Sequence, residues 1–475
     1  MGHLTQVPVK RLDPERFGSV LSTERYALFE GAIQRARTMF EGRVVWNLNS
    51  TAKGGGVAEM LRSLLAYARG ADVDARWLVI EGDPEFFRIT KRIHNRLHGS
   101  AGDAGPLGDA ERDVYESTLQ RNAAELKDLV GPDDVVILHD PQTAGLAPVF
   151  EGVAPLVVWR CHVGLDLPND MARDAWRFLV PYVSAADAYI FSREAYTWEG
   201  LDRDKTRIIP PSIDAFSAKN QDIDKPTLQA ILCATGIIDE TGNGIPATFL
   251  REDGSPGRVD RPTVMFEGGR PPPPGARLVV QVSRWDRLKD PVGVVEGFAR
   301  HVAPAADAHL VLAGPSVEAV ADDPEGAEVL EESRRAWEAL PADVRPRVHL
   351  ATLPMEDGEE NAAIVNALQR RADVVVQKSI AEGFGLTVSE AMWKARPVVA
   401  TRIGGIQDQI VHGSTGLLVD DPHDLRAFGE AVTTLLDNAQ DAARMGKEAQ
   451  SRVRDEFLGP RHLMQYVDLI GKLLS

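Results

Sequence analysis

The feature that most constrains the fold of this chain is a repeated alternation of short apolar runs with stretches of helical spacing. The runs are apolar almost throughout rather than at every second position, which is typical of strands in a parallel sheet covered by helices on both faces. In the first part of the chain they fall at residues 44–48, 76–80, 135–138, 156–159, 188–191 and 207–209. They predict an α/β fold.

The alternation stops between residues 216 and 275 and then starts again. That segment contains Gly-Asn-Gly, Asp-Gly-Ser-Pro-Gly and a run of prolines, which are typical of turns and linkers. A second series of apolar runs follows at 278–282, 310–313, 348–350, 374–376 and 397–400. Two such halves predict two Rossmann-like domains facing a central cleft, with ligands beyond the carboxyl ends of the strands.

The 475 residues exceed what one hydrophobic core usually supports, so we predict several parts. Residues 1–43 are expected to form an N-terminal helical extension, because apolar residues recur there near helical spacing. The two Rossmann-like domains are expected at 44–215 and 276–455, with a linker or insertion at 216–275. Residues 456–475 are expected to form a C-terminal helix that crosses back to the first domain.

The charge balance narrows the class of partner. The chain has 53 basic and 70 acidic residues, a net charge of −17, which argues against a general surface for nucleic acid or anionic membranes. No apolar run approaches the roughly 18 residues of a membrane span, and the N-terminus shows no signal peptide. Two cysteines do not make a disulfide framework. We therefore expect a cytoplasmic protein in which any phosphate site is a local cluster of cations.

Three consecutive glycines, Gly54, Gly55 and Gly56, follow the first apolar run and precede a helical stretch. Glycines at such a place let backbone N–H groups approach an anion, and the start of a helix adds positive potential. The surrounding residues match neither the dinucleotide fingerprint nor a P-loop. The sequence leaves open whether this is a ligand loop or a tight turn.

A second motif follows the run at 278–282, where Arg284 and Lys289 lie in a strand-to-helix loop. Two cations there could grip a diphosphate, because fixed positive charge stabilises the negative charge of a departing phosphate group. The competing interpretation is a solvated loop in which both cations pair with Asp286 and Asp290.

The third motif runs from Glu382 to Met392 after the run at 374–376. Gly383 and Gly385 would expose N–H groups at a helix start, a natural phosphate seat. A carboxylate beside such a seat repels phosphate but accepts hydrogen bonds from sugar hydroxyls well. A capped helix with solvent-facing glutamates is the alternative, and the placement favours a functional role.

In the first half, His162 lies just after the run at 156–159, at the end of the expected strand, and could touch a transferred sugar or its acceptor. A buried structural histidine is an equally good interpretation of that placement. Asp140 sits at the end of the preceding run, although an aspartate before a proline is also a good start for a helix.

Together these motifs resemble those of the retaining GT-B glycosyltransferases of family 4. Two glutamates eight positions apart around Gly-Phe-Gly-Leu-Thr, preceded by the two cations, are specific to that pattern. Longer stretches are similar to the trehalose glycosyltransferring synthases within it, namely 49–59, 76–82, 139–142, 159–162, 210–214 and 390–394. The chain departs from the family at 216–275, where it is longer; because this segment joins the two expected domains, it bears on domain closure and nucleotide preference.

The resemblance implies synthesis of α,α-trehalose from a nucleoside-diphosphate glucose and free glucose, without a tightly bound cofactor. Arg284 and Lys289 would hold the donor diphosphate, Glu382 the 3- and 4-hydroxyls of the donor glucose, and Glu390 the ribose. His162 would lie near the donor glucose and the acceptor. The other expected contacts are Gly54, Gly55, Gly56, Gly383, Phe384, Gly385, Leu386 and Thr387 for the donor, and Asp140, Gln142 and Arg160 for the acceptor.

No carboxylate nucleophile is evident beside His162, which favours front-face transfer over the double displacement of retaining glycosidases. Another family 4 transferase, with a sugar phosphate or polyol acceptor, shares the donor motifs. A nicotinamide dehydrogenase is a third interpretation, but the glycine fingerprint of that class is absent from this sequence. A non-catalytic sugar or nucleotide sensor is the non-enzyme alternative. The sequence does not decide the donor nucleotide, a need for Mg²⁺, or whether the chain forms a homodimer.

Overall fold

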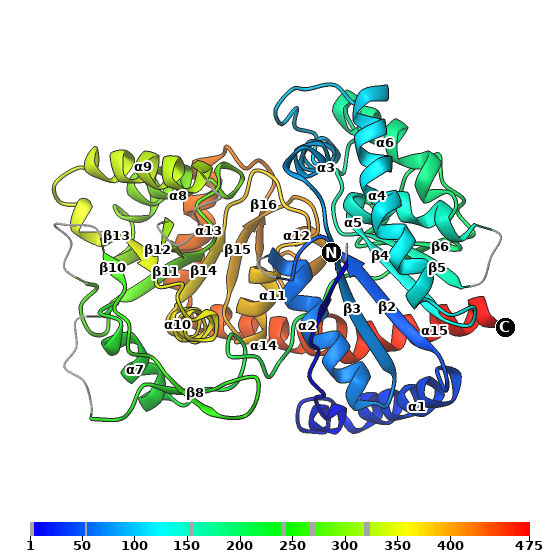
Figure 1. Cartoon of the computed structure of the whole chain (residues 1–475). Helices are drawn as coiled ribbons and strands as arrows, with labels where there is room; N and C mark the ends of the chain where they lie inside the picture. The colour runs from blue at the N-terminus through cyan, green and yellow to red at the C-terminus, as the bar shows by residue number, and fades with distance from the viewer. Residues whose placement is uncertain (1–3, 53–54, 152–154, 239–243, 266–270, 318–323) are drawn as a thin grey trace. The chain divides into compact units, whose positions relative to one another are not determined.

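The computed structural model describes residues 4–52, 55–151, 155–238, 244–265, 271–317 and 324–475. The chain divides into two compact units, one made of Met1–Ile213 with Asp455–Ser475 and the other of Asp214–Arg454. Each unit is built on one seven-stranded sheet with helices packed against it (Figure 1). This is the predicted α/β architecture.

The sheet of the first unit has the strand order β1-β3-β2-β4-β5-β6-β7. Neighbouring strands are parallel except β1, which is antiparallel to β3. The strands are β1 (Leu4–Val7), β2 (Val44–Asn49), β3 (Asp74–Ile80), β4 (Val135–His139), β5 (Leu156–Cys161), β6 (Ala188–Phe191) and β7 (Thr206–Ile208). The N-terminal extension was expected to be helical. It contains the helix α1 (Thr23–Met39), but it also contributes the edge strand β1, which the sequence did not predict.

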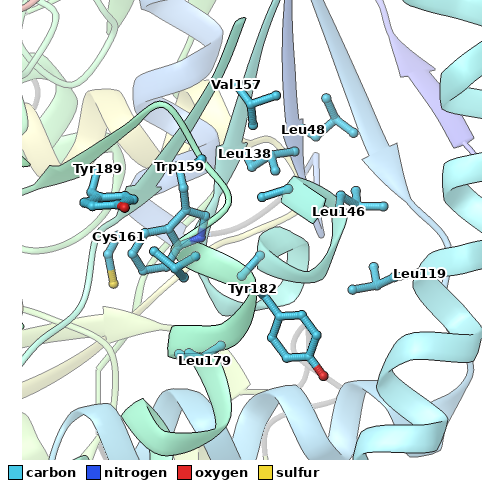
Figure 2. Packing of buried hydrophobic residues seen from close by; sticks show 14 of the residues in the cluster. Leu48, Leu119, Leu138, Leu146, Val157, Trp159, Cys161, Leu179, Tyr182 and Tyr189 are labelled. Carbon is cyan, nitrogen blue, oxygen red and sulfur yellow. The ribbon is translucent and has the colours of Figure 1, made fainter. Parts of the chain in front are cut away.

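Both faces of this sheet are buried. On β2, Trp46 and Leu48 pack into one hydrophobic cluster while Val45 packs into another, since successive side chains of a strand point to opposite faces. Figure 2 shows part of the first cluster, with Trp159 of β5 and Tyr182 among its large side chains. Burial on both sides explains why these strands are continuously apolar.

Helices cover the two faces of the first sheet. Helix α1 packs against α15, and α15 packs against α2, while α3 packs against α4 and α6 (Figure 1). The helices are α1 (Thr23–Met39), α2 (Gly55–Gly70), α3 (Pro84–Leu97), α4 (Asp109–Leu129), α5 (Asp140–Thr143), α6 (Asp170–Val183) and α15 (Gly459–Leu474). The C-terminal helix α15 thus belongs to the first unit.

The sheet of the second unit has the order β10-β13-β12-β11-β14-β15-β16, and only the short edge strand β10 is antiparallel. Its strands are β10 (Val264–Met265), β11 (Arg277–Val282), β12 (Ala308–Pro315), β13 (Val348–Leu353), β14 (Val374–Gln377), β15 (Val398–Thr401) and β16 (Leu417–Val419). Its helices are α7 (Lys225–Ala234), α8 (Pro291–Gly297), α9 (Pro324–Glu338), α10 (Gly358–Arg371), α11 (Leu386–Trp393), α12 (Ile406–Gln409), α13 (Leu425–Asp437) and α14 (Ala439–Glu456).

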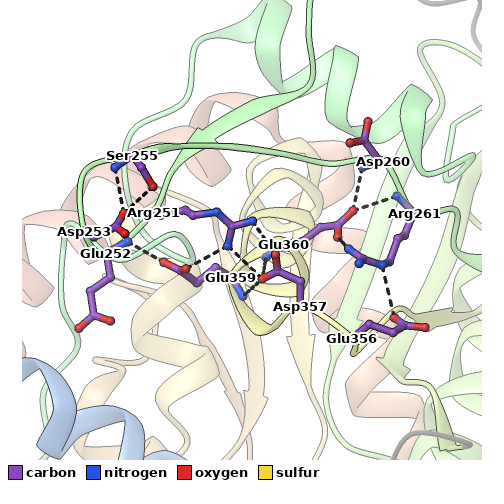
Figure 3. A network of polar contacts seen from close by, with 10 residues as sticks. All are labelled: Arg251, Glu252, Asp253, Ser255, Asp260, Arg261, Glu356, Asp357, Glu359 and Glu360. Carbon is purple, nitrogen blue, oxygen red and sulfur yellow. Dashed lines mark hydrogen bonds and ion pairs between the residues drawn. The ribbon is translucent and has the colours of Figure 1, made fainter. Parts of the chain in front are cut away.

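The segment 216–275, expected as a linker or insertion, is a folded part of the second unit where the structure describes it. It contains α7, which packs on α10, a two-stranded hairpin of β8 (Thr248–Leu250) and β9 (Pro256–Arg258), and β10. Arg251 beside this hairpin pairs with Asp357 and Glu359 at the start of α10 (Figure 3). This guanidinium lowers the pKa of Asp357 to about 2.

Glu360 is the buried anchor of the same segment (Figure 3). Its Oε1 accepts from the backbone N–H groups of Asp260 and Arg261, at 2.8 and 2.9 Å, and its Oε2 pairs with the Arg261 guanidinium. Glu360→Ala leaves these donors unsatisfied, so we expect it to lower the free energy of unfolding by about 2 kcal/mol. Equilibrium denaturation checks this against Glu356→Ala, which removes an exposed carboxylate 3.9 Å from Arg261 and should cost less than about 1 kcal/mol. Equal losses in the two variants would contradict the anchor.

Candidate active site

The centre of the candidate site in the second unit is an ion pair between Lys289 and Glu382. Lys289 ends a short helical turn after β11, and Glu382 lies in the loop after β14. Lys289 Nζ donates to Glu382 Oε2 at 2.5 Å, and the two side chains are only 16% and 13% exposed. Since β11 and β14 are neighbouring parallel strands, their carboxyl ends meet at one edge of the sheet and bring the two loops together.

The turn that carries Lys289 is hydrogen-bonded to β11 and, through it, to the residue that follows β14. Gln281 of β11 donates from Nε2 to the Lys289 carbonyl at 3.0 Å and accepts from the Lys378 N–H at 3.2 Å. The buried ammonium of Lys378 forms an ion pair with Asp290, whose backbone is left-handed with φ 48°. This pairing holds an unusual turn conformation in place, and with it the backbone position of Lys289.

The loop after Glu382 leads into α11, whose first residue follows Gly385. Gly385 has φ +82°, and a Cβ there would lie 3.0 Å from Ile406 and 3.2 Å from Glu382, so only glycine fits. Gln409 donates to the carbonyls of Phe384 and Gly385, at 2.5 and 3.2 Å. Glycine at the N-cap offers no side chain to the first N–H groups of α11, Leu386 and Thr387, and these can meet an anion.

Glu390 lies inside α11 and is buried, with 3% of its side chain exposed. Lys219 Nζ is 3.5 Å from its Oε1, while its Oε2 has no hydrogen-bond partner among the described residues. A buried carboxylate oxygen without a donor is costly, and a ligand hydroxyl would satisfy it.

Arg284 does not join these side chains. Its guanidinium is 65% exposed and pairs with Asp286 at 2.9 Å, as the solvated-loop interpretation of this motif predicts. The structure therefore brings Lys289 and Glu382 together and leaves Arg284 on the surface of its loop.

The first unit gathers a second set of polar side chains at the carboxyl ends of its strands. His162 Nε2 lies 3.1 Å from His139 Nδ1, and His139 Nε2 lies 3.1 Å from Asn47 Oδ1. The two imidazole rings are stacked at 5.5 Å between centroids. Burial lowers the pKa of His162 well below its usual value and that of His139 to about 3, and the charge of Arg160 adds to both effects.

Asp140 begins the short helix α5 with φ 64°, and its Oδ1 accepts from the His162 backbone N–H at 2.8 Å. Desolvation raises the pKa of Asp140 to about 7, against the lowering effects of that hydrogen bond and of Arg160. The structure therefore places one carboxylate, that of Asp140, next to the backbone of His162. Both residues were expected from the sequence as site residues, and each directly follows one of the neighbouring strands β4 and β5.

The acceptor-binding role expected for Arg160 does not fit its geometry. Its side chain has no exposed surface, and its guanidinium donates to His462, Tyr466 and the Ile209 carbonyl. Gln142 is half-buried in α5. Of the glycine run, Gly54 lies outside the described residues, while Gly55, with φ +78°, and Gly56 are exposed at the start of α2.

Three further residues of these sites were not expected from the sequence, namely Gln281, Lys378 and Asn47. All three are polar residues within or at the end of otherwise apolar strands, and all three are buried. A polar residue that interrupts an apolar strand could have indicated such a site residue in the sequence, because a buried polar group needs a hydrogen-bond partner.

Comparisons with known proteins show to which family the chain belongs. Residues 47–198 match the trehalose synthase N-terminal domain, and residues 268–452 match the glycosyl transferases group 1. A trehalose synthase from Pyrococcus horikoshii is 35% identical over 97% of this chain and 96% of its own length. The chain belongs to the trehalose synthase family. Another trehalose synthase, from Rubrobacter xylanophilus, is 34% identical over 97% of this chain and 96% of its own length.

Solved structures agree on the fold of this family member. An α,α-trehalose-phosphate synthase (UDP-forming) from Burkholderia xenovorans, in complex with glucose-6-phosphate, aligns with a TM-score of 0.65 at 15% identity. The alignment covers 91% of this chain and 100% of that one. The predicted GT-B fold class is confirmed, and the group 1 match makes the trehalose synthase family member a glycosyltransferase. Among its described helices, none is both long and apolar enough to cross a bilayer.

Proposed function

We propose that this protein makes α,α-trehalose from a nucleoside-diphosphate glucose and free glucose, with retention of the anomeric configuration. The observation that carries the proposal is the contact of Lys289 with Glu382 beside the start of α11. It joins a cation for a leaving diphosphate to a carboxylate for sugar hydroxyls. The trehalose synthases at 34–35% identity support the product, since each aligns over nearly its whole length.

In this proposal the second unit holds the donor. Lys289 and the N–H groups at the start of α11 stabilise the charge that develops as the diphosphate leaves. Glu382 accepts hydrogen bonds from the donor glucose, and its pairing with Lys289 fixes its orientation. Glu390 accepts from the ribose hydroxyls through the oxygen that lacks a partner among the described residues.

The first unit receives the acceptor at His162 and Asp140. We propose front-face transfer, in which the leaving phosphate takes the proton of the acceptor hydroxyl and the protein supplies positioning and charge. In this scheme the Asp140 carboxyl, whose Oδ1 accepts from the His162 N–H, binds the acceptor hydroxyls.

The direct test incubates the purified protein with UDP-, ADP- or GDP-glucose and ¹³C-glucose, with and without EDTA. We expect a non-reducing α,α-linked disaccharide, identified by NMR, from at least one donor. Glucose 6-phosphate as the acceptor is the control for a different family 4 transferase. Product from glucose 6-phosphate but not from glucose would overturn the proposed acceptor.

The Asp140→Asn variant distinguishes a role of Asp140 in binding the acceptor from a role as the nucleophile of a double displacement. Because the carboxyl titrates near pH 7, we expect kcat/KM for glucose in the wild type to fall as the pH drops below about 7, where the anion is lost. The asparagine keeps an oxygen for the His162 N–H and tolerates a positive φ. The variant should raise the KM for glucose, lose this pH dependence, and keep kcat within about tenfold. A loss of kcat beyond about 1,000-fold, with a glycosyl adduct trapped on the wild type, would instead indicate double displacement.

A further inference from the structure

A fully buried arginine lies behind His162. Arg160 of β5 donates from Nε to His162 Nδ1 at 3.4 Å and from Nη1 to His462 Nε2 at 3.0 Å. It also donates to the Tyr466 hydroxyl at 2.9 Å and to the Ile209 carbonyl at 3.1 Å. These partners are neutral groups, so the guanidinium acts as a branched donor rather than as half of an ion pair.

The N–H groups of Arg160 determine which ring nitrogen carries the proton in His162 and in His462. A guanidinium has only N–H groups, so the nitrogens that face it, His162 Nδ1 and His462 Nε2, must carry lone pairs. The proton of neutral His162 is then on Nε2, and that of neutral His462 is on Nδ1. Burial lowers the pKa of both imidazoles, which agrees with neutral rings.

The remaining contacts agree with these tautomers. His162 Nε2–H can donate to His139 Nδ1 at 3.1 Å, and His139 Nε2–H to Asn47 Oδ1 at 3.1 Å. On the other branch, His462 Nδ1–H can donate to Ser212 Oγ at 2.9 Å. Each contact then has one donor and one acceptor, so both ring nitrogens of His162 are engaged.

Two of the residues that accept hydrogen bonds from Arg160 belong to α15, the C-terminal helix. His462 and Tyr466 lie one turn apart with rings stacked at 5.4 Å between centroids. The start of the helix is anchored by Arg461, which donates to the carbonyls of Pro210 and Pro211 at 2.8 and 2.9 Å. Partial burial lowers the pKa of Arg461 to about 9, and the charge of Arg160 adds to this effect.

We propose that Arg160, held by His462 and Tyr466 of α15, is a positioning residue that locks His162 as its neutral Nε2–H tautomer. The proposal rests on the proposed function in that His162 faces the sugar. His162 then contacts the substrate with a fixed ring and exchanges no proton. The titratable and charged groups around it are His139, Asp140, Arg160, Cys161, Arg461 and His462.

The first test needs no substrate. In wild-type protein with ¹⁵N-labelled histidine, assigned with His162→Asn and His462→Gln, we expect His162 to show a protonated Nε2 and a bare Nδ1. His462 should show the reverse, and neither ring should gain a second proton from about pH 5 to 8. A protonated Nδ1 in His162, or titration of His162 in that range, would overturn the proposal whether or not the enzyme transfers glucose.

The second test measures turnover. Arg160→Lys keeps the charge but loses the branched geometry, and we expect kcat to fall roughly 10- to 100-fold with little change in the KM for the donor. His162 should then titrate within the activity profile. Tyr466→Phe, a milder change if Arg160→Lys misfolds, should lower kcat in the same direction.

Ile470→Ala is the matched control, because it removes a buried apolar side chain one turn beyond Tyr466 on the same helix. It should lower thermal stability and leave the His162 tautomer and the pH profile as in the wild type. Unchanged kcat and pH profile in folded Arg160→Lys and Tyr466→Phe, with an active wild type, would refute the positioning role. Inactivity of the wild type with every donor would instead refute the proposed function.

Discussion

Replacing Lys289 by glutamine should lower kcat by about 100- to 1,000-fold, because a fixed cation at the leaving diphosphate is lost. Glutamine is the informative substitution, since its amide can still donate to Glu382, which accepts from Lys289 Nζ at 2.5 Å. An alanine would leave a mostly buried carboxylate without that partner. We therefore expect Lys289→Gln to fold, with a melting temperature close to that of the wild type. Single-turnover kinetics with saturating donor and glucose would measure the effect.

Arg287→Gln is the matched control for Lys289→Gln. Arg287 lies in the same short turn, but its guanidinium pairs with Glu328 and Glu332 of α9 rather than with Glu382. Its kcat should stay within about twofold of the wild type, as for a surface pair. Arg284→Gln tests the second predicted cation, which pairs with Asp286 on the surface. If Lys289→Gln turned over at the wild-type rate, the assignment of this pair to the leaving group would be wrong.

The second large effect is expected at Glu390. The Glu390→Gln variant should weaken binding of the nucleoside diphosphate by about 10- to 100-fold, because a hydrogen bond to a charged group contributes roughly 1.5–3 kcal/mol. The reason is the buried Oε2, which has no partner among the described residues and would be satisfied by a ribose hydroxyl. Isothermal titration with UDP, ADP and GDP would measure the change in Kd for the nucleotide that binds best.

Glu382→Gln is the counterpart of Glu390→Gln. It changes the carboxylate proposed to bind the donor glucose and keeps an oxygen for Lys289. We expect its affinity for free nucleoside diphosphate to stay near that of the wild type, and its kcat/KM for the nucleotide sugar to fall. Equal losses of nucleotide affinity in both variants would contradict the separate roles of the two glutamates.

Much of the strand pattern could be read from the sequence. The runs expected at 44–48, 135–138 and 278–282 became β2 (Val44–Asn49), β4 (Val135–His139) and β11 (Arg277–Val282). The reason is local, because a strand buried on both faces must be apolar at nearly every position. The turn at Gly385 is local as well, because its backbone is left-handed, with φ +82°, a conformation that glycine adopts without strain.

Other features depended on partners that are distant in sequence. Strand β1 has a half-exposed pattern and acquires its place only by pairing with β3. The segment 244–265 has the composition of a linker and is folded because Arg251 and Arg261 find acidic partners near the start of α10, about a hundred residues away. Composition describes such a segment alone and carries no information about those partners.

The sequence by itself determined the positions of most of the buried parallel strands, the glycine turn at Gly385 and the residue types available for a glycosyltransferase site. Only the tertiary structure decided that Lys289 meets Glu382 while Arg284 faces water, and that Asp140 lies against His162. It also showed that the Arg160 guanidinium donates to His462 and Tyr466 of α15, in place of the acceptor contact that the sequence predicted. Burial on both faces leaves a continuous apolar run along a strand, whereas a pairing between side chains 93 or 306 residues apart leaves no such pattern.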